Sequence, residues 1–143
     1  MIKAISEDIW LRYKKLLSTS HKLYVPALPE TLPYLGIIAG PFDYVPPETI
    51  LDRLRPWLRS RGIASVFYFL MEGSSENHPA DYEISVSELT EATLSALNNG
   101  FENVLVGTDF SWALFMNHEG TLHVAGPDDL FACLQSWDRE RQL

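Results

Sequence analysis

The side chains of this chain that could act as an acid, a base or a nucleophile lie in separate parts of the sequence. Nucleophilic catalysis requires a nucleophile, a base and an orienting group to converge, but the chain contains no GxSxG, HExxH or CxxC motif. His118 and Glu119 are adjacent, in a segment between Asn117 and Gly120 whose composition is typical of a tight turn. We therefore interpret this pair as turn residues and predict neither a catalytic residue nor an enzymatic activity.

Metal and phosphate chemistry are also disfavoured by residue spacing. His78, Asp81 and Glu83 come closest to a metal site, but one histidine among scattered acids lacks the spacing of such a site. The single cysteine, Cys133, excludes an internal disulfide, and its place beside an apolar helical stripe predicts a buried, inert thiol. We therefore predict no metal and no cofactor. Four arginines could bind phosphate, but we expect a solvated helix face that neutralises nearby acids: Arg53, Arg55, Arg59 and Arg61.

Charge is distributed unevenly along the chain, which has a formal net charge of -8. No lysine or arginine occurs between Gly62 and Asp138. A field of one sign repels phosphate backbones and attracts basic surfaces, so we expect no direct nucleic-acid binding and a basic protein partner. The alternative is that the acids only keep the protein in solution. The acids of this part are Glu72, Glu76, Asp81, Glu83, Glu88, Glu91, Glu102, Asp109, Glu119, Asp128, Asp129 and Asp138.

The stretch from residue 101 to 129 predicts three antiparallel strands joined by two tight turns and followed by a helix. Residues 103–106, 112–116 and 121–125 are rich in Val, Leu, Phe and Trp, and Gly, Asp and Asn lie between them. We therefore expect a three-stranded meander.

The middle strand of this meander carries apolar side chains on both faces. Alternation places Leu114 on one face and Phe115 on the other, so we expect the strand inside a sheet that helices cover on both faces. If Met116 pairs with Thr121, His123 in the third strand lies opposite Leu114.

Four helices and two further strands are expected outside the meander. Ser85 and Glu88 form a predicted capping box for the third helix. Pro56 should kink the second helix or make it restart at Arg55. An apolar run at 34–40 predicts a buried strand, and the most β-prone run, 64–71, predicts a central one that leads into a polar loop. The helices are expected to begin at Ser6, Pro46, Ser85 and Asp128.

Length and composition indicate one α+β domain covering residues 1–143. A chain of 143 residues with 46% hydrophobic residues can bury one core without disulfide or metal staples. The mixed order of helices and strands disfavours a doubly wound parallel fold and favours a mainly antiparallel sheet with about four helices packed on it. We expect no signal peptide and no membrane span, and a cytoplasmic location.

The run from Val104 to Gly126, VLVGTDFSWALFMNHEGTLHVAG, resembles a segment found in small bacterial proteins. The shared pattern is a strand, a turn, a strand with Trp, a His-Glu or His-Asp turn and a further strand. Some of these proteins are immunity proteins that neutralise polymorphic or contact-dependent toxins. The resemblance implies a role class, a small acidic cytoplasmic protein that blocks a toxin, often a basic nuclease. It implies no binding residues.

The predicted function is therefore that of a protein-binding inhibitor whose contacts lie where acids coincide with exposed turns. Because successive turns of a meander lie at opposite ends, Asp109 and Glu119 should not contribute equally. One alternative is a small-molecule-binding protein or enzyme whose pocket draws on Trp112, His118, Glu119 and Tyr82; another is a homo-oligomeric accessory subunit. The expected contact residues are Glu72, Glu76, Asp81, Tyr82, Glu83, Asp109 and Glu119.

Overall fold

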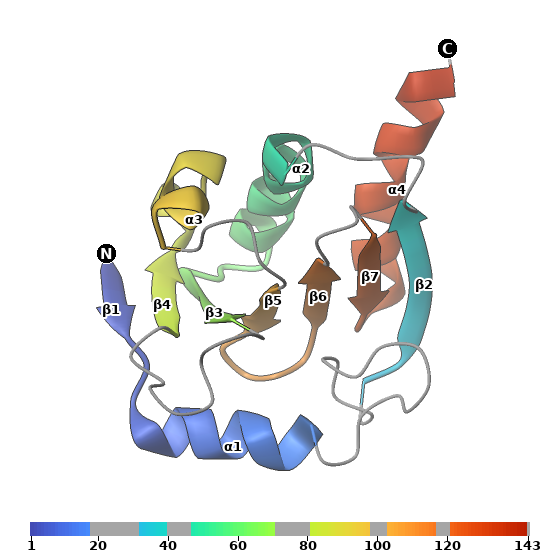
Figure 1. Cartoon of the computed structure of the whole chain (residues 1–143). Coiled ribbons are helices and arrows are strands. Elements are labelled where there is room, and N and C mark those ends of the chain that lie inside the picture. Colours follow the sequence, from blue (N-terminus) through green and yellow to red (C-terminus); the bar gives the residue numbers. More distant parts are fainter. Residues whose placement is uncertain (18–31, 40–46, 71–80, 98–102, 117–120, 143) are drawn as a thin grey trace.

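The computed structural model describes residues 1–17, 32–39, 47–70, 81–97, 103–116 and 121–142. They form a seven-stranded sheet with four α-helices packed on it (Figure 1), which confirms the predicted α+β class. The strands are β1 (Ile2–Ala4), β2 (Tyr34–Ala39), β3 (Ser65–Leu70), β4 (Tyr82–Ser85), β5 (Asn103–Gly107), β6 (Ala113–Met116) and β7 (Leu122–Ala125). The helices are α1 (Glu7–Leu17), α2 (Pro47–Ser60), α3 (Glu91–Leu97) and α4 (Asp128–Gln142), with a short 3-10 helix, η2 (Val86–Glu88), after β4.

The sheet is antiparallel throughout, with the strand order β1-β4-β3-β5-β6-β7-β2. The predicted meander is confirmed as β5-β6-β7. Strand β6 lies between β5 and β7, as expected for a strand that is apolar on both faces. The strongly β-prone run is β3, which also lies inside the sheet.

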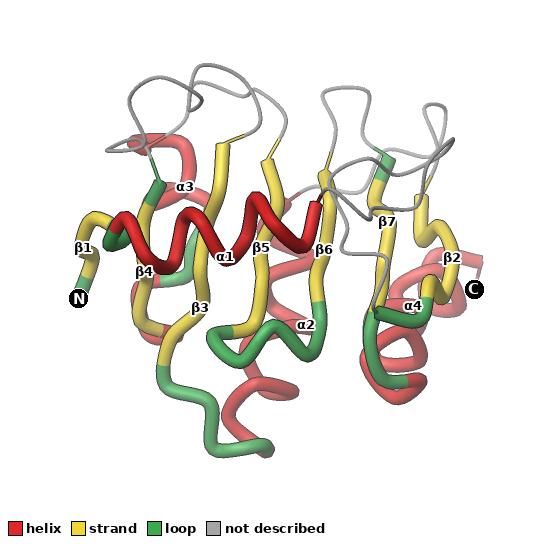
Figure 2. Tube along the Cα trace, turned by 90° about the horizontal axis from the view of Figure 1, so that it is seen from below, coloured by secondary structure: helices red, strands yellow, loops and turns green. Residues whose placement is uncertain are grey.

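Helices cover both faces of the sheet, as predicted. Helix α1 crosses one face, and α2, α3 and α4 lie on the other (Figures 1 and 2). Beneath α1, the ring of Tyr13 stacks on that of Phe69 with centroids 3.8 Å apart, in a core that also contains Phe115. On the opposite face, Leu54 of α2 and Leu114 of β6 belong to a larger core. The sheet therefore separates two hydrophobic cores.

Local sequence signals explain where three of the helices begin. The Ser6 Oγ accepts a hydrogen bond from the Ile9 N–H at 3.4 Å, which caps α1. Helix α2 starts at Pro47, whose fixed φ suits a first turn, and it runs past Pro56 without restarting at Arg55. Helix α4 carries two aspartates in its first turn, where the helix dipole favours negative charge.

The predicted start of the third helix is wrong. Ser85 is the last residue of β4, and its side chain makes no capping hydrogen bond. Helix α3 begins six residues later, at Glu91, where the Thr90 Oγ1 accepts a hydrogen bond from the Thr93 N–H at 3.2 Å. Pairing of residues 82–85 with β3 overrides the local capping signal.

Strand β2 is an edge strand, which corrects the prediction that it is buried. Ile38 points into the core, but Ile37 is 51% exposed and Tyr34 is 37% exposed. An apolar run shows that a strand can be buried on both faces, but it does not show what covers the second face.

The pairing of β7 with β6 is shifted by one residue from the predicted register. Met116 pairs with Leu122, so His123 lies opposite Phe115 instead of Leu114. The observed register places Leu122 and Val124 in the same core as Leu114, because a shift by one residue moves every side chain to the other face. The hydrophobic pattern thus sets the register.

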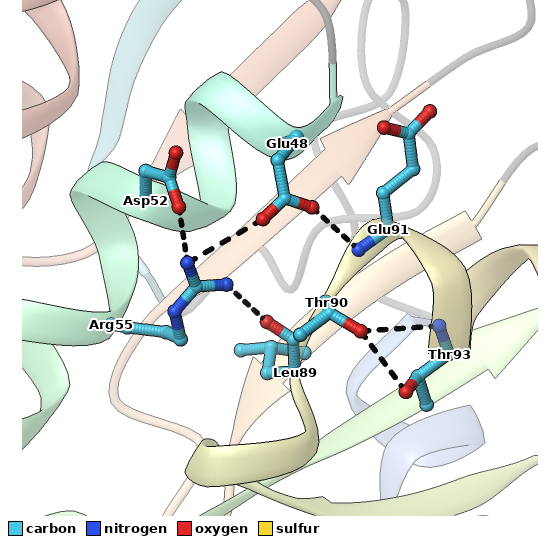
Figure 3. A network of polar contacts seen from close by, with 7 residues as sticks. All are labelled: Glu48, Asp52, Arg55, Leu89, Thr90, Glu91 and Thr93. Atoms are coloured by element: carbon cyan, nitrogen blue, oxygen red, sulfur yellow. Dashed lines mark hydrogen bonds and ion pairs between the residues drawn. The ribbon is translucent and has the colours of Figure 1, made fainter.

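An arginine-centred network joins α2 to the start of α3 (Figure 3). The Arg55 guanidinium donates to the Leu89 carbonyl at 2.6 Å and pairs with Asp52, and it lies 3.5 Å from the Glu48 carboxylate. Glu48 in turn accepts a hydrogen bond from the Glu91 N–H at 2.8 Å. This network confirms that Arg55 neutralises nearby acids, but its side chain is only 15% exposed, which corrects the prediction that it lies on a solvated helix face.

Replacing Arg55 with alanine should lower the free energy of unfolding by about 1–2 kcal/mol. The Leu89 carbonyl loses a charged donor, and two carboxylates lose their shared cation. Urea denaturation measures the change. Arg59→Ala is the matched control, because Arg59 is exposed on the same helix with no ion pair to another described residue; it should change stability by less than about 0.5 kcal/mol. Equal effects at both positions would show that the network contributes nothing.

Candidate partner-binding surface

One row of paired residues crosses five neighbouring strands at the end of the sheet where β3 and β6 finish. Figure 2 shows these strands side by side. The row fixes which connecting segments join the sheet at the same end. Its members, in order across the sheet, are Leu70, Asn103, Met116, Leu122 and Ala39.

Four segments outside the described residues join the chain at or next to this row: 40–46, 71–80, 98–102 and 117–120. Their sequences contain no lysine and no arginine. The described residues that flank these four segments therefore lie at or next to one end of the sheet, although the segments are scattered in the sequence. The acids of these segments are Asp43, Glu72, Glu76, Glu102 and Glu119.

The register also decides which predicted turn shares an end with the polar loop after β3. The segment that contains Glu119 follows Met116, in the same row as Leu70. The turn that contains Asp109 follows Gly107, which pairs with Val66 at the opposite end. Three of the expected contact residues, Glu72, Glu76 and Glu119, lie outside the described residues, as does His118.

Asp81 is fully buried, so a partner cannot contact its side chain in this fold. Its backbone carbonyl accepts a hydrogen bond from the Ile5 N–H at 3.1 Å. Burial and the nearby charge of Asp81 raise the pKa of Tyr13 in α1. Asp81 therefore belongs to the contact between α1 and β4, and we leave it out of the candidate surface.

Tyr82 and Glu83 are the first two residues of β4 and point to opposite faces of the sheet. Tyr82 is partly buried against the larger core. The Glu83 carboxylate accepts a hydrogen bond from the Ser65 Oγ at 2.6 Å and lies 3.6 Å from the Lys3 ammonium. Both side chains have structural contacts already, so neither is a free acidic or aromatic group.

Asp109 is exposed in the turn between β5 and β6. Its carboxylate accepts hydrogen bonds from the N–H and the Oγ of Ser111, at 3.0 and 2.6 Å. The next residue, Phe110, has a φ of 59° and is buried, with the Arg12 guanidinium 4.6 Å from its ring centroid. Asp109 thus stabilises a tight turn at the far end of the sheet.

Arg61 and the cysteine also have structural contacts. Arg61 pairs with Asp129, which lowers the pKa of that carboxyl, and stacks over the Trp57 ring at 4.4 Å. Cys133, predicted to be buried, is only partly buried; its thiol donates to the Arg53 carbonyl at 3.2 Å, and burial raises its pKa.

Two of the four residues expected to line a small-molecule pocket, His118 and Glu119, lie outside the described residues. Of the other two, Trp112 is fully buried and Tyr82 is partly buried against the same core. A histidine outside that set, His123 of β7, meets Tyr34, whose hydroxyl lies 3.0 Å from its Nδ1. This pair joins β2 to β7, and it could not be predicted because no local pattern relates two residues so far apart in the sequence.

Among the described residues, no group of three or more His, Cys, Asp or Glu side chains could hold a metal ion. None of the helices in the described part is both long and apolar enough to cross a membrane. No protein-family model matches this chain, and neither a curated protein nor a solved structure similar to it was found.

Proposed function

We propose that this chain is a small acidic protein-binding module of the immunity type, which inhibits a basic toxin such as a nuclease in the cytoplasm. The observation that carries the proposal is the joining of four segments with acids and no lysine or arginine at one end of the sheet. A cluster of one sign steers an oppositely charged partner toward it and raises the association rate.

The acids elsewhere in the described structure support the choice of this end. Several of them are already paired with cations, as in Glu83 with Lys3 and Asp129 with Arg61. Asp81 is buried and Asp109 is bound within its own turn. We therefore expect Glu119 to contribute to partner binding and Asp109 to contribute little.

The first test is binding and protection. The basic proteins encoded beside the gene of this chain are the first candidates, and each is purified and titrated at about 50 mM and about 500 mM salt. We expect one of them to bind tightly, with weaker binding at high salt, and to lose its toxicity when both proteins are produced together. If none binds and none is neutralised, the proposal is wrong.

A charge variant then locates the binding surface. The triple substitution Glu72→Gln, Glu76→Gln and Glu119→Gln should slow association at low salt by about tenfold and flatten its salt dependence, because electrostatic steering is lost. The matched control removes the same charge from exposed helix starts, through Glu7→Gln, Asp8→Asn and Asp128→Asn. Stopped-flow mixing measures both rates. Equal slowing by the two variants would mean that net charge matters and the surface does not.

A further inference from the structure

A tyrosine and a histidine form a hydrogen-bonded pair between the edge strand β2 and its neighbour β7. The Tyr34 hydroxyl lies 3.0 Å from the His123 Nδ1. His123 is 7% exposed, whereas Tyr34 is 37% exposed, so the imidazole lies on the inner side of the pair. The pair joins two strands whose backbone register shifts between Tyr34 and Gly36 and again between Ile37 and Ala39.

The pair depends on the protonation state of the imidazole. In a neutral ring with its proton on Nε2, Nδ1 accepts a hydrogen bond from the phenol. Protonation converts Nδ1 into a donor and places a positive charge on a buried ring, which costs free energy unless an anion compensates it.

The described groups that face the imidazole supply no anion. They are the phenol of Tyr34 from β2 and the ring of Phe115 from β6, with centroids 6.1 and 5.9 Å away, each tilted by 34°. At this distance and tilt, a cation–π attraction is at its outer limit. Burial accordingly lowers the pKa of His123 below its ordinary value.

In an edge strand, the loss of one side-chain contact should change the free energy of local opening by a measurable amount. Among the described strands, β2 pairs only with β7. Local opening needs less free energy at such an edge than in the central strands. Proton uptake by His123 in the open state therefore shifts the equilibrium of β2 from the closed state toward the open state.

We propose that the Tyr34–His123 pair is a pH-sensitive latch that holds edge strand β2 on the sheet at neutral pH and loosens it in mild acid. The latch is a property of the fold that does not depend on the proposed inhibitor function. The sign follows from linkage, because the open state binds the proton more tightly than the closed state. The pair therefore stabilises the closed strand fully above about pH 6.5, and this stabilisation decreases as the pH falls below that value.

Hydrogen exchange measured by mass spectrometry on the full chain tests the latch at pH 7.5 and pH 5.5. Protection factors, corrected for the intrinsic exchange rate at each pH, are compared between a peptide covering residues 35–39 of β2 and one covering residues 104–106 of β5. The ratio of β2 to β5 protection should fall by up to about tenfold at the lower pH, the limit for one group with an open-state pKa of about 6.5. His123→Gln keeps an acceptor but does not titrate, so the ratio should then be independent of pH.

Tyr34→Phe provides a second variant if His123→Gln does not fold. It removes the hydroxyl and leaves the imidazole, so protection of β2 should already be reduced at pH 7.5. An unchanged β2 to β5 ratio between the two pH values in the parent protein would overturn the proposal. An equal fall of that ratio in His123→Gln would also overturn it, because another group would then be responsible.

Discussion

Trp112→Ala is expected to lower the free energy of unfolding by about 3–5 kcal/mol, the usual cost of truncating a buried aromatic side chain. The indole is fully buried and meets the ring of Trp57 edge-on, with centroids 5.9 Å apart. It also fills the space beside Gly107 and Gly126, where an added methyl group would collide with the tryptophan. Urea denaturation followed by far-UV circular dichroism measures the change without relying on tryptophan fluorescence.

A comparison with Trp112→Phe separates apolar packing from hydrogen bonding. The Trp112 Nε1 is buried and has no hydrogen-bond partner among the described residues. Phenylalanine would keep part of the packing and leave no N–H group unpaired, so it should cost clearly less than alanine. A loss of less than about 1 kcal/mol for Trp112→Ala would mean that this side chain is exposed in solution.

Among the glycines that the structure describes, Gly126→Ala should be the most damaging substitution, with an expected loss of about 2–4 kcal/mol in the free energy of unfolding. Gly126 has a φ of 135°, a conformation that side chains rarely adopt. An added Cβ would lie 2.8 Å from the Trp112 Cβ, 3.0 Å from its backbone Cα and 3.2 Å from the Ser111 carbonyl oxygen. The backbone atoms cannot move aside without disturbing the start of β6.

Gly62→Ala is the matched control for this prediction. Gly62 also has a positive φ, 71°, but nothing lies within 4 Å of an added Cβ. Its substitution should cost only the backbone strain, about 1 kcal/mol. Thermal and urea unfolding of both variants measure the difference. If the two substitutions cost the same, the close approach of Trp112 to Gly126 is not maintained in solution.

The parts of the fold that could be predicted are those specified by local chemistry. The meander was recognisable because Gly, Asp and Asn separate short β-prone runs, and β6 could be placed inside the sheet because Leu114 and Phe115 are both apolar. Strands β1 and β4 were missed because they are short, and because β1 pairs with a strand that is distant in sequence.

The sequence predicted the acidic composition of the candidate surface but not the arrangement of its segments. Counting acids showed that one part of the chain is negative, but only the strand register shows that the segments after Leu70 and Met116 join the same end of the sheet. Asp81 was expected in a polar loop at the surface. No local signal reveals its burial, because the residues that interact with it, such as Ile5 and Tyr13, come from the start of the chain.

The strand order has a consequence for synthesis of the protein on the ribosome. The five inner strands come from one continuous part of the sequence, residues 65–125, whereas both edge strands come from the first 39 residues. Strand β2 is made early, but it cannot pair until β7, which ends at Ala125, has emerged. Its sequence, YLGIIA, carries no charge and no proline. Such a strand is prone to aggregate as long as it is unpaired. Nascent chains that stop before Ala125 should therefore depend most on chaperones.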